Sequence, residues 1–429
     1  MDWFSGKSLC DIVHRVFYLY KDKECVSNIE NGSISPYTTY SEVYKDCMKL
    51  FYSLRSIPKR SVVGLLCRNS SNYLISDITC VLSDFISVGI HLSWNSSKIS
   101  SIITSTDMKC IIMDSSKVSI LESIEPSVLS KIQKIIIIGS SIDLLENLPK
   151  HVAIEFWENI KSSITDEDIQ EHCKPWNEEP YAFPKTNENE QEACTIMFTS
   201  GSTGNPKGVV ISKKRWKRDF LCFPFAGCDK PLTILNHMSL AHGADRVLCW
   251  QMLHAGGRIA FSNPKSHEEL MNFIQLVKPT FFLALSHFWS RVYLDYRKEL
   301  SRRTMDRISC TYQKIKEYDE SKVSSVLPNS PLLDSFANFF DIRSDVIEEI
   351  REVWFGGRIF TPVTGGAHTS ELVLNWMKEV FAPKTTSGEE QGSRVQNAYG
   401  STEFTGISVN GEISQNIELK LIDVPEMSM

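Results

Sequence analysis

Short apolar runs alternate along this chain with longer stretches whose apolar residues recur at helical spacing. The apolar runs are rich in β-branched residues, as strands are, and lie at 62–66, 110–113, 135–138, 194–198, 209–211, 258–261, 280–283 and 358–360. The helical stretches lie at 40–54, 72–82, 98–104, 267–277 and 372–381. Because uninterrupted apolar strands need cover on both faces, this alternation predicts an α/β fold.

Two segments interrupt the alternation. Residues 165–192 are charged and contain prolines, so we expect a surface connection between two α/β lobes, roughly 1–175 and 190–400. Residues 296–335 are polar and helical in pattern, and they predict a helical excursion.

Composition excludes several classes of protein. The formal net charge of -6 offers no electrostatic basis for binding nucleic acid. The 12 cysteines show neither a CxxC pair nor the ligand spacing of a zinc site, and scattered thiols predict the reducing cytoplasm. The N-terminus lacks the pattern of a secretory signal, and no apolar stretch is long enough to span a bilayer.

Residues 199–208 form the most distinctive motif of the chain. Glycines let backbone N–H groups approach a phosphate, hydroxyls donate to its oxygens, and a lysine adds positive charge. The members with these properties are Thr199, Ser200, Gly201, Ser202, Thr203, Gly204 and Lys207. Apolar strands on both sides predict a hairpin-like loop over nucleotide phosphates rather than a P-loop, whose spacing Pro206 also breaks. The alternative is a surface loop that is rich in Gly and Ser by chance.

Three later segments follow in a fixed order. Residues 239–242 end in His242, residues 364–367 form a glycine-rich turn after an apolar run, and residues 397–403 read Asn-Ala-Tyr-Gly-Ser-Thr-Glu. Taken singly, each has a plain structural alternative: a structural histidine, an ordinary strand-to-helix turn, and a tight turn with a solvated glutamate.

Together with the loop, these segments resemble the motifs of the adenylate-forming superfamily, which includes acyl-CoA synthetases, luciferases, peptide-synthetase adenylation domains and carboxylic acid reductases. The resemblance runs over most of 37–429 and is greatest to the adenylation domain of carboxylic acid reductases. The start of a helix in that adenylation domain resembles Thr39-Tyr40-Ser41-Glu42 of this chain. The sequence pattern of its first lobe resembles residues 72–77 and 87–92. Ser239 and His368 stand where the family commonly has proline.

The resemblance implies the large N-terminal domain of these enzymes, with two α/β lobes of mostly parallel sheets. Residues 401–429 would begin a small β-barrel. The chain ends at Met429, before the position of the family's C-terminal lid domain with its catalytic lysine. We therefore expect that lid domain to be absent.

The resemblance also implies roles for single residues. Lys207 and the loop would hold the phosphates of ATP, His242 would lie beside the acyl and phosphate site, Thr402 would donate to the α-phosphate region, and Glu403 would hold Mg²⁺. Tyr399 would stack on adenine. The other nucleotide-binding positions would be Gly365, Gly366, Ala367, Asn397, Ala398, Gly400 and Ser401.

The implied reaction is ATP-dependent activation of a carboxylic acid to acyl-AMP, with release of pyrophosphate and transfer to the thiol of CoA or of a carrier phosphopantetheine. A fatty or aryl acid suits the aromatic content near His242, 286–289 and 364–365, although Phe288 and Trp289 are equally typical of a helix core. An acyl-carrier domain is a possible partner. Two alternatives stay open: the adenylation part of a carboxylic acid reductase, and a truncated, non-catalytic nucleotide- or acyl-binding protein.

The basic run 213–218 follows the loop. We interpret it as the exposed first turns of a helix with Ser212 as N-cap, the alternative being a patch that attracts ATP or an acidic partner.

Overall fold

The computed structural model describes residues 7–139, 148–172, 189–199, 206–222, 228, 230–314, 335, 337–338, 341–382, 394–414 and 417–420. By its internal contacts the chain forms two compact units, Met1–Phe273 (unit 1) and Ile274–Met429 (unit 2). Strands that precede and follow residues 165–192 share one sheet of unit 1, and the expected lobes 1–175 and 190–400 stay a prediction.

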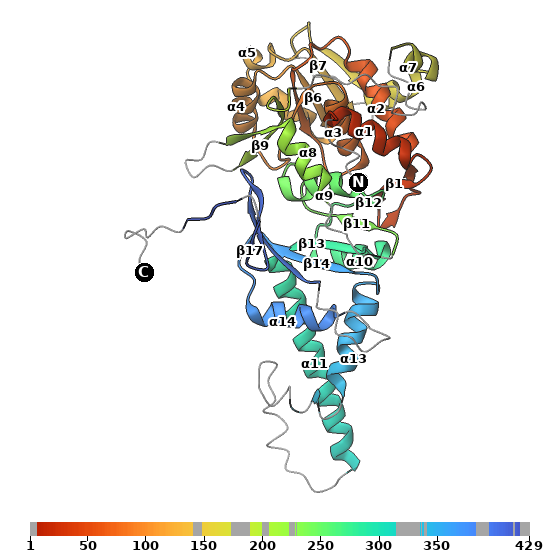
Figure 1. Cartoon of the computed structure of the whole chain (residues 1–429), viewed down its shortest axis with the longest axis vertical. Helices are drawn as coiled ribbons and strands as arrows, with labels where there is room; N and C mark the ends of the chain where they lie inside the picture. Colours follow the sequence, from red (N-terminus) through yellow and green to blue (C-terminus); the bar gives the residue numbers. More distant parts are fainter. Residues whose placement is uncertain are drawn as a thin grey trace. The chain divides into compact units, whose positions relative to one another are not determined.

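Unit 1 contains a seven-stranded sheet in the order β10-β9-β5-β4-β6-β7-β8 (Figure 1). All neighbours pair in parallel except β10 with β9, which are antiparallel. Its strands are β4 (Val62–Leu66), β5 (Ile86–Gly89), β6 (Cys110–Asp114), β7 (Lys134–Ile138), β8 (Ala153–Phe156), β9 (Ala193–Thr199) and β10 (Lys207–Ser212).

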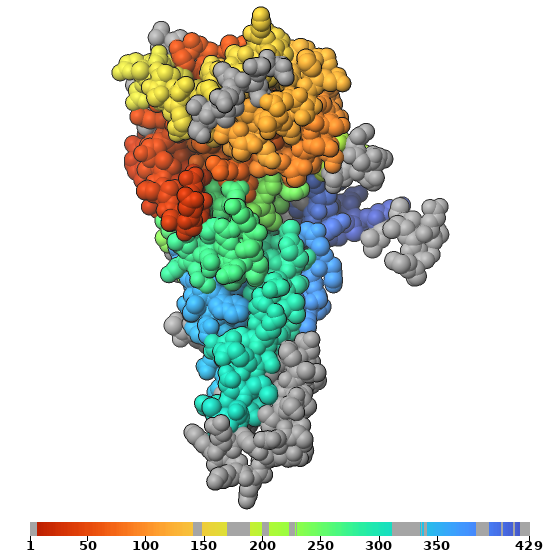
Figure 2. Space-filling model, turned by 180° about the vertical axis from the view of Figure 1, so that it is seen from behind, coloured from red at the N-terminus to blue at the C-terminus, as the bar shows by residue number. Residues whose placement is uncertain are grey.

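The central strands of this sheet are buried along their whole length, as the uninterrupted apolar runs predict. Every residue of β4, β6 and β7 is buried. The helical elements around the sheet are α1 (Leu9–Leu19), α2 (Tyr40–Leu54), α3 (Ser71–Leu82), α4 (Ser96–Thr106), η1 (Ser115–Ser123), α5 (Pro126–Leu129), α6 (Trp157–Ser163), α7 (Asp166–His172) and α8 (Lys213–Leu221). On the face that Figure 2 shows, much of the surface of unit 1 is coloured red to yellow, as expected for residues from its N-terminal half.

A second set of strands in unit 1 carries the segment that leads to His242. Strand β12 pairs in parallel with both β11 and β1, and β1 pairs antiparallel with the short β2 and β3. The bounds are β1 (Glu24–Glu30), β2 (Ser33–Ile34), β3 (Thr38–Thr39), β11 (Thr233–Asn236), β12 (Arg258–Phe261) and the helix α9 (Gly243–His254). Helix α10 (His267–Val277) follows and contains the boundary between the units.

Unit 2 holds the parallel strands β13, β14 and β15, to which β16 and β17 add antiparallel hairpins. Its strands are β13 (Phe281–Leu285), β14 (Thr361–Gly365), β15 (Gln396–Ser401), β16 (Thr405–Val409) and β17 (Glu412–Ile413). Its helical elements are α11 (Ser286–Lys314), α13 (Ile342–Glu349), η4 (Ile350–Trp354) and α14 (Glu371–Val380). The α/β prediction with mostly parallel sheets is confirmed.

Most element predictions match closely. Helix α2 spans the expected residues 40–54 and begins with a capping box, in which Thr39 and Glu42 satisfy each other's backbone N–H groups. The polar stretch from 296 is helical as far as Lys314, as part of α11. Within 165–192, helix α7 is present, and residues 173–188 lie outside the described residues.

The strand expected at 358–360 is wrong by a few residues. Gly356 and Gly357 have φ of +73° and +70°, so the chain is still turning there, and β14 begins only at Thr361. Phe360, the aromatic residue of the run, makes a cation–π contact instead: the Arg394 guanidinium lies 3.5 Å from the centre of its ring.

The basic run 213–218 forms α8, and Ser212 caps it by accepting a hydrogen bond from the Arg215 N–H, as predicted. The expectation that its first turns are exposed is only partly correct. Lys213 is buried and its Nζ lies 2.8 Å from an Asp84 oxygen and 3.1 Å from a Glu192 oxygen. The first residue of the run therefore joins the helix to the sheet.

Candidate functional site

The glycine-rich loop of unit 1 is the connection of a β-hairpin. Strands β9 and β10 pair antiparallel, with Thr199 directly opposite Lys207, so the prediction of a hairpin rather than a strand-to-helix turn is confirmed. Lys207 is exposed at the first position of β10. The other loop residues, Ser200, Gly201, Ser202, Thr203 and Gly204, lie outside the described residues.

The segment that carries His242 runs from β11 to α9 and is tied down by buried side chains. The Asn69 side-chain oxygen accepts the Leu240 N–H at 3.0 Å, and its amide donates to the Met238 carbonyl at 2.7 Å. The Tyr73 hydroxyl donates to the Leu240 carbonyl at 3.1 Å. The backbone before His242 is therefore held from both sides by residues at the end of β4 and in α3.

Asp245, in the first turn of α9, fixes the start of the same segment. Its Oδ2 accepts hydrogen bonds from the Asn236 amide at 2.7 Å and from the Met238 N–H at 2.9 Å. Complete burial outweighs these donors and raises the pKa of the Asp245 carboxyl to about 7.

His242 itself is the N-cap residue of α9, but its side chain makes no capping hydrogen bond. The imidazole is partly exposed and is partly covered by the His91 ring, with 4.2 Å between ring centres. His91 follows the carboxyl end of β5, which pairs in parallel with β9 so that Gly89 is opposite Met197. By this register, the ends of β5 and β9 bring His91 and Thr199 to the same edge of the sheet.

The start of α9 packs closely against that edge of the sheet. A Cβ on Gly243 would lie 3.0 Å from the Met197 sulfur, and one on Gly89 would lie 2.9 Å from the Ala241 Cα. Unit 1 thus places His242 beside the strand that enters the phosphate loop. Sequence reasoning assigned no role to His91; a histidine just beyond the carboxyl end of a buried parallel strand was the signal for it.

In unit 2, the glycine turn and the segment 397–403 meet at the carboxyl ends of parallel strands. Gly365 of β14 pairs with Ala398 of β15. A Cβ on Gly365 would lie 2.6 Å from the Ala398 carbonyl oxygen, so only glycine permits this approach. Gly366 follows with φ +78°, and both it and Ala367 are exposed. A hydrogen bond of 2.7 Å between the Thr364 and Thr369 hydroxyls closes the turn before α14.

Residues 397–401 continue into a hairpin with β16. Asn397 donates its N–H to the Asn410 side chain at 2.7 Å, and Tyr399 is 61% exposed. Gly400 lies opposite Gly406, and Ser401 lies opposite Thr405. Tyr399 is thus a large aromatic side chain on the surface of β15.

Thr402 and Glu403 form the tip of this hairpin. The Phe404 N–H donates to the Ser401 carbonyl at 3.2 Å and closes a turn with these two residues at its centre. The turn presents one hydroxyl and one carboxylate beyond the carboxyl end of β15.

A single carboxylate at this tip fits a magnesium ion that is shared with a nucleotide. Mg²⁺ is usually held by one or two carboxylates and by substrate phosphate oxygens. Within the part of the chain that the structure describes, no group of three or more His, Cys, Asp or Glu side chains gathers into a metal cage. Glu403 is the residue that would hold the ion here.

The aromatic residues expected near an acyl pocket belong to the core of unit 2. Phe288 is 5% and Trp289 0% exposed, and the Trp289 indole donates to the Val363 carbonyl at 3.0 Å. Trp289 also stacks on Phe355 with ring centres 5.6 Å apart. Both side chains therefore belong to the hydrophobic core, as the alternative interpretation of this segment predicts.

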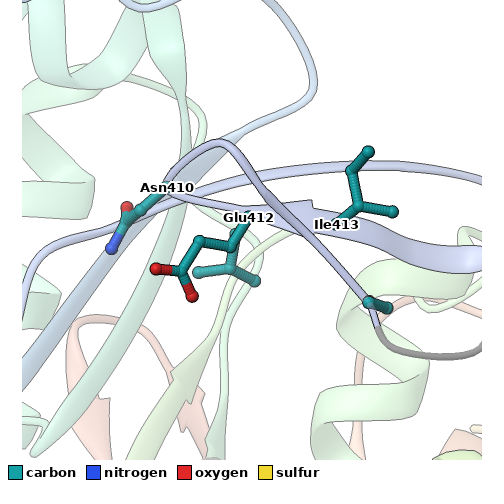
Figure 3. Close-up of a pocket in the computed structure, with 5 residues that line it drawn as sticks. Asn410, Glu412 and Ile413 are labelled. Atoms are coloured by element: carbon teal, nitrogen blue, oxygen red, sulfur yellow. The ribbon is translucent and has the colours of Figure 1, made fainter.

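A surface hollow of about 300 Å³ lies on the hairpin of β16 and β17. Glu412 and Ile413 point to opposite sides of the strand there, and Asn410 lies at the turn (Figure 3). The Asn410 side chain is already engaged by the backbone of β15. None of the predicted site residues lines this hollow, so we do not assign it to the reaction.

Known proteins resemble this chain in sequence and in fold. A family model described as AMP-binding enzyme matches residues 15–425. A carboxylic acid reductase of Mycobacterium marinum is 25% identical over 250 residues, which cover 57% of this chain and 18% of the relative. Long chain acyl-CoA synthetase 4 of Arabidopsis thaliana is 25% identical over 421 residues, covering 91% of this chain and 57% of the relative.

Among solved structures, the adenylation domain of the carboxylate reductase from Mycobacterium chelonae superposes with a TM-score of 0.71. The match has 19% identity and covers 98% of this chain and 62% of that chain. The chain thus spans less than two thirds of the length of these relatives. None of the described helices is both long and apolar enough to cross a membrane.

Proposed function

Because the chain belongs to the AMP-binding enzyme family, we propose that it activates a carboxylic acid with ATP, forming acyl-AMP and pyrophosphate. The observation that carries this proposal is the close approach of Gly365 to the Ala398 carbonyl, beside the exposed Tyr399. We propose that this backbone and the Tyr399 ring contact the adenine ring of ATP. A fatty or aryl acid is the proposed substrate class.

The proposed chemistry is an in-line displacement. An oxygen of the acid forms a bond to the α-phosphorus of ATP, the bond from that phosphorus to the bridging oxygen breaks, and pyrophosphate leaves with the electron pair. No general base is needed, because a carboxylic acid is already ionised at pH 7. The protein must therefore orient the two reactants and stabilise negative charge on the phosphates.

We assign these tasks to residues at the two strand edges. In unit 1, Lys207 and the loop hydroxyls bind the β- and γ-phosphates, and His242 lies beside the acyl and α-phosphate groups. In unit 2, Thr402 donates to the α-phosphate region and Glu403 holds Mg²⁺. When bound, the ion neutralises phosphate charge. The residues of 365–367 and 397–401 bind the nucleoside.

We further propose that the acyl group passes to the thiol of CoA or of a carrier phosphopantetheine. The two kinds of relative support one acceptor each: an acyl-CoA synthetase for CoA, and a carboxylic acid reductase solved together with its carrier domain for phosphopantetheine. Thioester formation from preformed acyl-AMP with either thiol separates the two.

The test is acid-dependent exchange of pyrophosphate into ATP by the purified chain, with Mg²⁺ and a panel of fatty and aryl acids. We expect exchange that falls by about 100-fold or more in Lys207→Ala and in Glu403→Ala, since each removes a charge at the phosphates. Lys214→Ala, an exposed lysine of α8, is the matched control and should keep the wild-type rate. ATP binding without exchange for any acid would contradict the proposal.

A further inference from the structure

Two histidines from distant parts of unit 1 form an imidazole pair. His91 follows β5 and His242 precedes α9, and their rings meet edge to face at an angle of 62°, with 4.2 Å between centres. Trp94 packs on His91 with ring centres 4.9 Å apart and an angle of 51°. The His91 ring therefore has an aromatic neighbour on each side.

The backbone around the pair is held firmly. The Ala241 Cα packs directly over Gly89, where there is no room for a larger residue. Asn69 and Tyr73 bind the Leu240 N–H and carbonyl. The contact between the rings therefore follows from two fixed backbone segments rather than from a free choice of side-chain rotamer.

Neither ring donates or accepts a hydrogen bond within the described residues, so the ring nitrogens remain available to a ligand. The elements around the pair bring few ionisable groups. Helix α9 contributes Asp245, whose carboxylate binds Asn236 and Met238, α3 contributes the Tyr73 hydroxyl, and β9 contributes the apolar Met197. Among the described residues, burial and the partner ring therefore govern the charge of the pair.

We propose that His91 is a positioning residue for acid activation: its ring holds the His242 imidazole in one orientation as an uncharged hydrogen-bonding group beside the substrate carboxylate. This inference rests on the proposed function. A cationic imidazole would form an ion pair with the carboxylate in the ground state and weaken it as a nucleophile, whereas a neutral N–H orients it at smaller cost. His91 touches His242 and acts through it.

The electrostatics of the pair agree with this role. Burial, together with the neighbouring His242, lowers the pKa of His91 to about 4, and burial lowers the pKa of His242. A charge on His242 disfavours a proton on His91. Both rings are neutral at pH 7.

His91→Ala tests the proposal, because it removes the ring that covers and holds the His242 imidazole, whereas His91→Phe keeps an aromatic ring there. His151→Phe is the matched control, since His151 is an exposed histidine of unit 1. The first readout is the NMR titration of the His242 imidazole in the full chain. Because burial is what lowers the His242 pKa, we expect that pKa to rise in His91→Ala and to stay near the wild-type value in His91→Phe and His151→Phe; an unchanged value in His91→Ala would overturn the proposal.

The second readout is the pH profile of pyrophosphate exchange. We expect a flatter profile between pH 6 and 8 for the wild type and for His91→Phe, and a loss of about 4-fold towards pH 6 for His91→Ala as the His242 pKa returns towards its ordinary value, in kcat rather than in KM for the acid. A wild-type profile in His91→Ala would overturn this inference alone. Absence of exchange in the wild type would overturn the proposed function, and with it the role of His91, whatever the NMR titration shows.

Discussion

Gly365 shows how one residue without a side chain determines the geometry of a site. Its missing Cβ allows β14 to approach the Ala398 carbonyl, and the contact is with backbone, which cannot move aside as a flexible side chain would. The requirement for glycine at this position is therefore steric, because its φ is not in the left-handed region.

We predict that Gly365→Ala lowers the free energy of unfolding by about 1–3 kcal/mol, because β14 and β15 must separate to admit the methyl group. The same substitution should weaken nucleotide binding, measured by calorimetry. Gly406→Ala, at an exposed position of β16 with no atom within 4 Å of the added Cβ, is the matched control. Equal stability of the two variants would contradict the steric argument.

At the scale of elements, Asp245 links the start of α9 to the end of β11. Its folded-state pKa of about 7 is higher than the value near 4 expected in the unfolded chain. The folded protein therefore binds this proton more tightly than the unfolded chain does. The stability from this group is full below about pH 4 and is lost as the pH rises towards 7.

Asp245→Asn should remove this pH dependence. We expect the difference in unfolding free energy between wild type and variant to shift in favour of the variant by a few kcal/mol from pH 4 to pH 8. Denaturant unfolding at a series of pH values measures it, and other titrating groups cancel in the difference. If the unfolding free energies of the two proteins differed by the same amount at every pH, the Asp245 carboxyl would not bind its proton more tightly in the folded protein.

The base of helix α8 is joined to the sheet by a cluster of four charges. Lys213 bridges Asp84 and Glu192, and the Arg60 guanidinium lies 3.1 Å from the same Asp84 oxygen and 2.9 Å from the Ala193 carbonyl. These partners hold the pKa of Asp84 below its usual range, although its burial acts in the opposite direction. The cluster positions the strand that enters the phosphate loop.

We predict that Lys213→Met destabilises the chain by about 1–2 kcal/mol, because it leaves two carboxylates without their most buried partner. The matched control is Lys298→Met. Lys298 pairs with Asp295 on an exposed helix face, so its loss should change stability by less than about 0.5 kcal/mol. Thermal unfolding compares the two, and equal shifts would contradict a structural role for the cluster.

At the scale of the whole molecule, the cysteines are distributed by burial rather than by pairing. All described cysteines are free thiols. Burial raises the pKa of those at positions 25, 47, 67, 80, 110 and 249, which makes them poor nucleophiles. Cys222 and Cys310 are exposed. This pattern is consistent with the predicted reducing compartment, which stays a prediction.

A thiol reagent should therefore distinguish two classes in the native protein. We expect Cys222 and Cys310 to react within minutes and the buried thiols to react only on unfolding, as mass spectrometry of alkylated peptides would show. A reductant should leave the melting temperature unchanged. Fast labelling of Cys47 or Cys110 in the native chain would contradict the described packing of unit 1.

Much of the fold follows from local sequence patterns. The apolar runs predicted β4 and β12 residue by residue, and Ser212 was predicted as the N-cap of α8. These features depend on neighbours along the chain: alternating burial, capping side chains and glycine at a strand end. The α/β class and the family motifs were therefore determined by the sequence alone.

Other features were decided only by the tertiary structure. No pattern near His91 indicates that β5 lies beside β9 and that its end meets the start of α9. Likewise, a run of basic residues does not reveal that Lys213 is buried between two carboxylates, and Phe288 and Trp289 suited a pocket as well as a core. Sheet order and burial depend on contacts between residues far apart in sequence, and local periodicity carries no information about which of them meet.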